Sequence, residues 1–284
     1  MGEKAARVGD PHTCPQTIVL IPHTGGPILL PGADKVQICG NPGARILDAA
    51  TCFGPDDAIN KGAVTVLLQH LPSARQTDST FHGGIIIAGA PTVEIGGPTF
   101  AIPSNFRIQG SDDFKGKTVL DLYYLSTLPS GKVLLDRLAA SGETITITEY
   151  IGTDNSYCSA TNPISARVGI PTGSTVEYSP GISIQVYDSS GNLIDMPPQI
   201  VLGHELDHAL GNAEGTQAYG TDPMPPPSEP RIPEEEARAI GVGSHSSDAP
   251  SENSLRRDAG LPERGNHLGI PIVGSVPNLR PGES

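Results

Sequence analysis

A phrase that recurs three times in the first hundred residues constrains the fold of this part of the chain more than any other feature. Each copy contains Ala-Arg, an Asp three residues after the arginine, and a Cys or His seven residues after it. The aligned positions are Arg7, Arg45 and Arg75, then Asp10, Asp48 and Asp78, then Cys14, Cys52 and His82. Strand-type alternation with glycine punctuation accompanies each copy. Three such units are expected to wrap around a common axis.

A body of this size, rich in glycine and short strands, can bury little apolar surface. A metal ion that holds converging loops would supply the stability that packing cannot. The available ligands are His12, Cys14, His23, Cys52, His70 and His82, of which His70 is better explained as a surface histidine. The four cysteines (Cys14, Cys39, Cys52 and Cys158) are scattered and follow no apolar signal segment, which favours reduced thiols or metal ligation over disulfides.

Residues 4–97 resemble the PAAR-repeat proteins that form the conical spike tips of type VI secretion systems. The resemblance rests on ARVGDPHTCP, PHTGGPI, PGARILDAATC and FHGGIIIAGAPTVEIGG, although Asn41-Pro42-Gly43-Ala44-Arg45 and Pro72-Ser73-Ala74-Arg75 depart from Pro-Ala-Ala-Arg. It implies one structural zinc ion near the tip, bound by three His and one Cys. Carried over to this chain, the ligands are His12, His23, Cys52 and His82, with Cys14 as a rival for one place. The alternative is a structural or adhesive β-module whose His and Cys are incidental.

The composition changes after this region. Residues 98–117 are punctuated by Gly, Pro, Asn and Asp, as in a linker, and two helical patterns follow, with a break at 129–131. Residues 143–151 alternate as a strand does, and SARVGIP, STVEYSP and SIQVYDSSGNLID suggest further strands. The fold class expected is two domains, a small all-β PAAR-like cone followed by an α+β domain. The boundaries expected are 1–97 for the cone, 98–117 for a linker, 118–267 for the second domain and 268–284 for an extended tail.

VLGHELDHALGNAEG, residues 201–215, contains the pattern H-E-x-x-H. Prolines before it and glycines at its end predict a helix. On a helix, His204 and His208 share one face and could bind one zinc ion. Glu205 would then take a proton from the attacking water and deliver it to the leaving amine.

This pattern lacks a third protein ligand for the zinc ion. A second helix expected at 234–243 begins with three glutamates, and we favour Glu235, then Glu236, as that ligand. His245 and His267 are weaker candidates. The alternative for the glutamates is a charge cluster that complements the helix dipole.

Residues 118–267 resemble the zinc metallopeptidases of the NleD-like effector family, on HELDHALGNAEGT, PEEEARAIGVG and SENSLRRDAGLPERG. The resemblance implies that this α+β domain is a zincin-like metallopeptidase domain. It also implies that His204 and His208 bind the catalytic zinc and that Glu205 is catalytic. Substrate identity does not transfer with a motif. Arg256, Arg257 or Arg264 could orient a substrate, or they could be paired charges on a solvated helix. Tyr219 could polarise an oxyanion.

The net charge of −13 argues against nucleic acid and anionic membranes as partners, and no stretch is apolar for long enough to span a bilayer. The resemblances together imply a type VI secretion effector. It would be made in the bacterial cytoplasm, dock on a VgrG-type spike trimer, and cleave protein in a recipient cell with a catalytic zinc besides the structural one. An immunity protein or a chaperone could be further partners. The alternatives are a structural spike cap or adaptor with an inactive second domain, and a zinc amidase acting on cell-wall peptides.

Overall fold

The computed structural model describes residues 2–152 and 156–272. The chain divides into two compact units, which confirms the expected two-part organisation. The first comprises Met1–Ser104 with Lys115–Leu120, and the second comprises Asn105–Phe114 with Asp121–Ser284.

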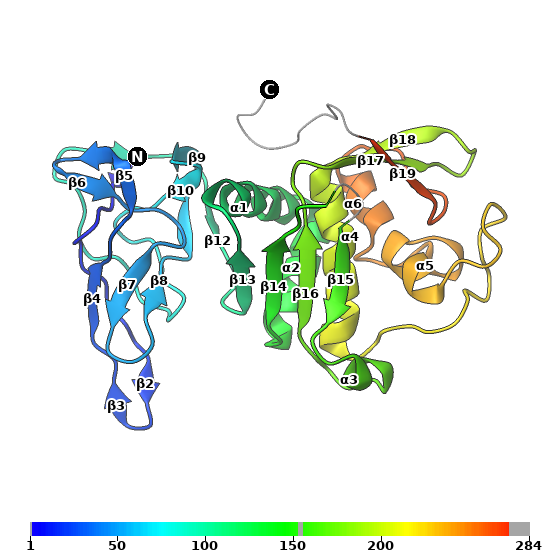
Figure 1. The fold of residues 1–284 in the computed structure, drawn as a ribbon, viewed down its shortest axis with the longest axis horizontal. Coiled ribbons are helices and arrows are strands. Elements are labelled where there is room, and N and C mark those ends of the chain that lie inside the picture. The colour runs from blue at the N-terminus through cyan, green and yellow to red at the C-terminus, as the bar shows by residue number, and fades with distance from the viewer. Residues whose placement is uncertain (1, 153–155, 273–284) are drawn as a thin grey trace. The chain divides into compact units, whose positions relative to one another are not determined.

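The first unit is built from short strands (Figure 1). They are β1 (Glu3–Lys4), β2 (Thr17–Ile18), β3 (Ile21–Pro22), β4 (Gly25–Ile28), β5 (Ala33–Ile38), β6 (Asn41–Gly43), β7 (Ala49–Cys52), β8 (Asp57–Ala58), β9 (Lys61–Leu68), β10 (Leu71–Ser73), β11 (Glu94–Ile95) and β12 (Thr99–Ala101).

The three copies of the repeat surround one axis, as their sequence predicts. The Ala6 N–H donates to the carbonyl of Ala74 at 2.9 Å, Ala74 to Ala44 at 2.8 Å, and Ala44 to Ala6 at 2.9 Å, which closes a ring. All three alanines are fully buried, together with one isoleucine from each copy (Ile28, Ile59 and Ile86). Only a small side chain fits where three backbones meet, so this core is narrow.

The repeated Arg and Asp of each copy form an ion pair three residues apart. The Nη2–Oδ1 distances are 2.8 Å for Arg7–Asp10, 3.0 Å for Arg45–Asp48 and 3.0 Å for Arg75–Asp78. In each pair the arginine backbone N–H also donates to the aspartate, so one carboxylate closes the turn from two sides. This explains why the two residue types recur at that spacing.

The second unit combines sheets with helices, as expected for an α+β domain. Its elements are β13 (Phe106–Gln109), α1 (Asp112–Thr127, of which Lys115–Leu120 belong to the first unit), α2 (Pro129–Ser141), β14 (Ile145–Glu149), β15 (Tyr157–Ala160), α3 (Pro163–Arg167), β16 (Ser174–Tyr178), β17 (Ser183–Tyr187), β18 (Leu193–Met196), α4 (Pro198–Glu214), α5 (Glu234–Ile240), a 3₁₀ turn η1 (Gly243–His245), α6 (Glu252–Asp258) and β19 (Gly269–Ile272).

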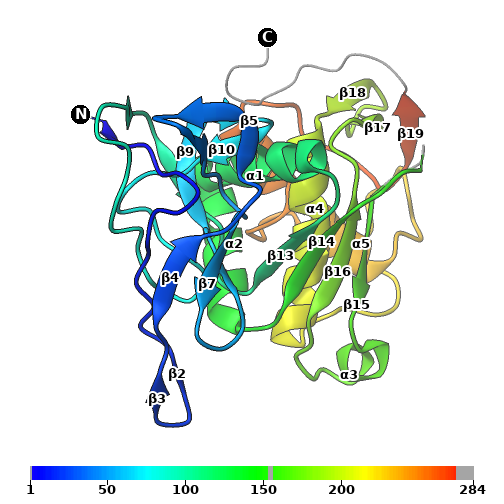
Figure 2. The ribbon, with the colours of Figure 1, turned by 60° about the vertical axis from the view of Figure 1, so that its left-hand side comes forward.

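One sheet has the order β13-β14-β16-β15, with the first three strands parallel and β15 antiparallel at the end. Helix α4 packs against β15 and β16 and against α2, so that this helix lies on one face of the sheet (Figure 2). Strands β17, β18 and β19 form a second small sheet. Nearly every residue of α4 is buried, which makes it the central helix of the unit.

The expected elements are found, with local differences. SARVGIP, which suggested a strand, contains the end of α3, because Asn162 caps this short helix and Pro163 begins it. Residues 98–117, expected as a linker, include β12, β13 and the first turn of α1. In the segment expected as a tail, 269–272 form β19, while 273–284 lie outside the described residues. Within the described part of the chain, no helix is long and apolar enough to cross a bilayer.

Candidate metal centres and active site

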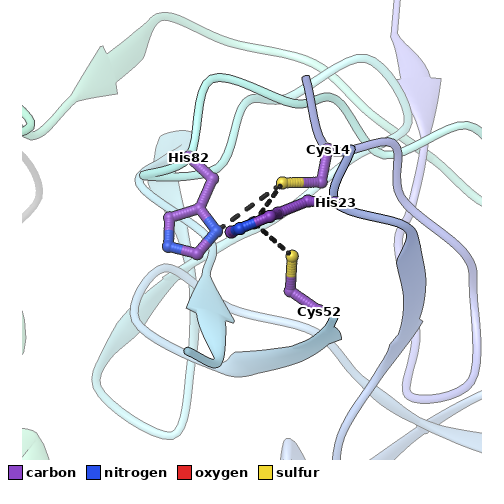
Figure 3. Close-up of side chains that lie close together, drawn as sticks. All are labelled: Cys14, His23, Cys52 and His82. Carbon is purple, nitrogen blue, oxygen red and sulfur yellow. Dashed lines mark hydrogen bonds between the residues drawn. The ribbon is translucent and has the colours of Figure 1, made fainter. Parts of the chain in front are cut away.

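Four potential zinc ligands converge in the first unit: Cys14, His23, Cys52 and His82 (Figure 3). The Nδ1 atom of His23 lies 3.3 Å from the Cys52 sulfur and 3.6 Å from the Cys14 sulfur, and Nδ1 of His82 lies 3.6 Å from the Cys14 sulfur. Ligand atoms around a tetrahedral zinc ion stand about 3.5 Å apart. The four side chains therefore already have the spacing of a closed zinc site.

The environment of Cys52 also favours a cation. Burial of this thiol and the neighbouring Cys14 raise the pKa of Cys52 to about 11. A thiolate at this position therefore needs compensating positive charge, which a zinc ion would supply.

His12, the fourth ligand that the PAAR resemblance implied, lies outside this group. Its Nδ1 is 2.9 Å from the carbonyl of Gly26, and its Nε2 is 3.4 Å from a carboxylate oxygen of Asp57. The side chains of His12 and Asp57 are completely buried. Cys14 occupies the place expected for His12, and it is the residue that the repeat aligns with Cys52 and His82.

In the second unit, the two histidines of the H-E-x-x-H pattern face each other from successive turns of α4. Their Nε2 atoms are 3.2 Å apart, and each lies 3.5 Å from Oε2 of Glu236 on α5. This oxygen is buried and has no hydrogen-bond partner within the described residues. Three ligand atoms at these separations form one face of a tetrahedron suited to zinc.

A carboxylate lies behind each histidine. Nδ1 of His208 is 3.1 Å from Oε1 of Glu235, and Nδ1 of His204 is 3.1 Å from Oε2 of Glu252. A proton held on Nδ1 leaves the Nε2 lone pair free to face a cation. Glu235 is held in turn by Arg238, and Glu252 by Arg256 and Arg264.

These carboxylates make the site attractive to positive charge. Burial lowers the pKa of His204, but the neighbouring carboxylates of Glu236 and Glu252 outweigh it and raise this pKa to about 9. Burial likewise opposes ionisation of Glu235, yet His208 and Arg238 lower its pKa to about 2. A divalent cation can replace the protons that the two histidines would otherwise retain.

Glu205 lies beside this group, at a pocket of about 300 Å³ lined also by His204, His208, Glu236 and Cys158. Burial raises the pKa of Glu205, which the two histidines partly offset. A carboxylate with a raised pKa is a stronger base, as a proton-transferring residue requires. Burial also raises the pKa of the Cys158 thiol.

The remaining sequence candidates are placed as follows. Arg256 and Arg264 are buried and engaged with Glu252, whereas Arg257 pairs with Glu263 at the surface.

His245 contacts Asp248 rather than the histidine pair. Nε2 of His267 lies 3.4 Å from Glu236 and lines the pocket. The Tyr219 hydroxyl donates to Gln217, another residue of the pocket wall.

The supporting residues Glu252, Arg238 and Asp207 did not emerge from the sequence. Arg238 bridges Glu235 and Asp207, with Nη–O distances of 2.6 Å and 2.8 Å. Burial raises the pKa of Asp207 to about 6, although Arg238 counteracts it. The only signal in the sequence is that Asp207, Arg238 and Glu252 all lie in the stretches on which the family resemblance rests.

Comparison with known proteins agrees with this class of site, a metallopeptidase centre. The Peptidase_M91 family model, described as an effector protein, matches residues 102–267, more than half of the chain. The chain therefore belongs to the Peptidase_M91 family. The PAAR motif model matches residues 20–88, so this chain joins a PAAR region to a metallopeptidase effector domain.

Solved structures similar to this chain include light chains of botulinum neurotoxins. The serotype F light chain of Clostridium botulinum has 16% identity and a TM-score of 0.35, and the match covers 47% of this chain and 45% of that one. The type D light chain has 17% identity and a TM-score of 0.37, covering 52% and 49%. This chain thus spans about half the length of these light chains. No curated protein matches it.

Proposed function

We propose that this protein is a type VI secretion effector whose second unit is a zinc endopeptidase. The observation that carries the proposal is the triangle of His204 Nε2, His208 Nε2 and Glu236 Oε2, with sides of 3.2, 3.5 and 3.5 Å, beside the buried Glu205. Two imidazoles and a carboxylate form a catalytic zinc set that leaves one coordination position open.

The residues of the chain would divide the work of peptide hydrolysis. A zinc ion bound by the triangle supplies a Lewis acid, which lowers the pKa of water and polarises a carbonyl. Glu205 accepts the proton of the attacking water and donates it to the leaving amine. Glu235 and Glu252 orient the two imidazoles through their Nδ1 atoms.

The first unit would serve delivery. Its closed set of two Cys and two His would bind a second, structural zinc ion, which holds the three repeats together at one end. The PAAR region would dock on a VgrG-type spike trimer, and firing from the producing cytoplasm would carry the peptidase into a recipient cell. We assign residues 1–97 to the cone and residues 105–267 to the peptidase, because β13 (Phe106–Gln109) belongs to the sheet of the second unit. An immunity protein or a chaperone would complete the set of partners.

Replacing Glu205 tests the proposed chemistry. We expect Glu205→Gln to lower peptidase activity by at least about a hundredfold, because it removes the proton carrier. The measurement is the appearance of new protein N-termini in a lysate of recipient cells treated with the zinc-loaded protein. Glu214→Gln, on the same helix but outside the pocket, is the control and should retain activity.

Three other results would change the proposed function. Undiminished cleavage by Glu205→Gln would remove the assigned role of this residue. Cleavage of purified peptidoglycan, without any new protein N-termini, would instead identify a cell-wall amidase. If neither substrate is cleaved, a spike cap or adaptor is the better description.

A further inference from the structure

A second cavity lies against α4, with a volume of about 390 Å³, and it shares no lining residue with the pocket that contains Glu205. Asp207, Leu210 and Glu214 of α4 line it, and their spacing of three and four residues places them on one face of the helix. Cavities of roughly 300–1,000 Å³ accommodate small organic molecules. The proposed peptide hydrolysis makes no use of this cavity.

Arg238 of α5 separates the two cavities. It passes across α4 at Gly211, where a Cβ would lie 2.9 Å from its Nη2 atom. On one side, Nη2 donates at 2.6 Å to Glu235, which lines the pocket of the histidine pair. On the other side, Nη1 donates at 2.8 Å to Asp207, which lines the second cavity. The second cavity is therefore a distinct place for a ligand.

The charged wall of this cavity carries more carboxylates than guanidinium groups. Two arginines and three acidic residues line it: Arg137, Arg238, Asp207, Glu214 and Asp248. Arg137 of α2 donates to both carboxylate oxygens of Glu214. Arg238 is divided between two carboxylates, as described above. Because both guanidinium groups are already engaged, an anionic ligand would have to displace a carboxylate.

One buried acceptor in this wall lacks a donor. Asp207 is only 1% exposed, and its Oδ1 atom has no hydrogen-bond partner among the described residues. A buried carboxylate oxygen without a donor costs free energy, which a ligand N–H group would recover. Asp248 is exposed and stands at the rim of the same cavity. The wall therefore requires a ligand that donates hydrogen bonds and carries positive charge.

The carboxylates are too far apart to share a metal ion. Within residues 2–152 and 156–272, two groups of three or more potential ligands converge, and neither includes Asp207, Glu214 or Asp248. The cavity also has an apolar side, formed by Leu210, Ala249 and Pro250. An alkyl stem packs well on such a surface while its charged end remains at the polar groups. These features favour an organic cation over an inorganic one.

We propose that this cavity binds a small organic cation, an alkylammonium or alkylguanidinium, whose charged end donates to Asp207 and whose stem packs on Leu210 and Pro250. The ligand supplies the donor that Oδ1 of Asp207 lacks and adds the positive charge that the wall is short of. The inference does not depend on the proposed peptidase function. The residues that would bind zinc or transfer the proton line the other cavity.

Titration calorimetry of the full-length, zinc-loaded protein with n-butylguanidinium tests the ligand class. We expect saturable binding of one cation per chain. n-Butanol and butyrate have a similar stem without the cationic donors, and we expect both to bind at least about tenfold more weakly. No binding of the cation would overturn the proposal. So would equal binding of n-butanol, which indicates a purely apolar site, or tighter binding of butyrate, which indicates an anion site.

Variants test where the cation binds. Asp207→Asn retains the size of the side chain and should weaken binding by about tenfold or more, the effect of a lost charged hydrogen bond. Asp248→Asn, at the exposed rim, should weaken it by about two- to fivefold. Glu205→Gln changes the other cavity and should bind the cation as the wild type does. Weaker binding by Glu205→Gln, with Asp207→Asn unaffected, would place the cation in the catalytic pocket and overturn the proposal.

A surface variant separates specific binding from attraction to an acidic protein. Asp136→Asn removes the same charge from an exposed position of α2, outside the cavity, and should leave the affinity unchanged. Equal weakening by Asp136→Asn and Asp248→Asn would mean that only overall charge matters, which contradicts the proposal. If the buried Asp207→Asn variant does not fold, this rim comparison decides. The titration measures binding rather than cleavage, so an inactive peptidase would leave its result intact.

Discussion

Two glutamates that follow each other in the chain, Glu235 and Glu236, have different partners. Successive residues of a helix point about 100° apart, so only one of them can reach the space between the histidines. That residue is Glu236, whereas Glu235 lies behind His208 at 3.1 Å. Sequence analysis favoured Glu235 as the ligand, because the pattern requires a carboxylate but does not specify the rotation of α5.

The geometry predicts that Glu235 acts on the metal through His208. Glu235→Gln is expected to weaken zinc binding by about 10- to 100-fold, since it removes the charge that orients the imidazole. The measurement is a competition titration with a zinc chelator. Glu234→Gln, at the neighbouring position of the same helix, should bind zinc normally. Equal zinc affinity in both variants would contradict this role.

At the other metal site, Cys14 and His12 lie two residues apart but differ in environment. Cys14→Ser is expected to release one zinc ion per chain, because it removes one of four converging ligands. His12→Asn should keep that ion and lower stability instead, by about 1–3 kcal/mol, because Asp57 loses its buried partner. Zinc content per chain and thermal unfolding distinguish the two. The reverse pattern would restore His12 as the ligand.

At the scale of the elements, α4 and α2 both end at a glycine in the left-handed backbone conformation. Gly215 terminates α4 with φ of 66°, and a Cβ built there would lie 2.5 Å from the carbonyl oxygen of Gly169. Gly142 ends α2 with φ of 72°, but nothing lies within 4 Å of its Cβ position. The two glycines share a backbone conformation and differ in the space around them.

This contrast predicts different costs for the same substitution. Gly142→Ala should destabilise the protein by about 1 kcal/mol, the usual cost of a left-handed alanine. Gly215→Ala should cost roughly 2–4 kcal/mol, because the backbone of Gly169 must also move. Denaturant unfolding of the two variants measures the difference. An equal loss of unfolding free energy in the two variants would contradict this prediction, because it would show that the backbone at Gly169 moves at no measurable cost.

At the scale of the whole molecule, residues 98–117 were expected to form a linker but contain the strands β12 and β13. β13 (Phe106–Gln109) pairs in parallel with β14, and Phe106 is fully buried. A fragment of residues 118–284 would lose this strand and part of α1, whereas a fragment of 102–284 retains both. We expect the longer fragment to unfold cooperatively and the shorter one to aggregate or lose its near-UV circular dichroism signal. Cooperative unfolding of both would show that β13 is dispensable.

The sequence by itself determined the features that depend on local spacing. The repeat predicted three units around one axis, and the alignment of Cys14, Cys52 and His82 in it agrees with the side chains that converge. The helical period placed His204 and His208 on one face of α4, and Gly215 matched the end of that helix. These features follow from backbone geometry over a few residues, which the order of the amino acids specifies directly.

Only the tertiary structure decided which distant side chains meet. The choice of Glu236 over Glu235, the support of His204 by Glu252, and the position of His12 beside Asp57 all depend on how separate elements pack. The cavity lined by Asp207 and Arg238 depends on the same packing. Packing fixes the rotation and register of each element through contacts that are remote in the chain, and no periodicity within a single segment contains that information.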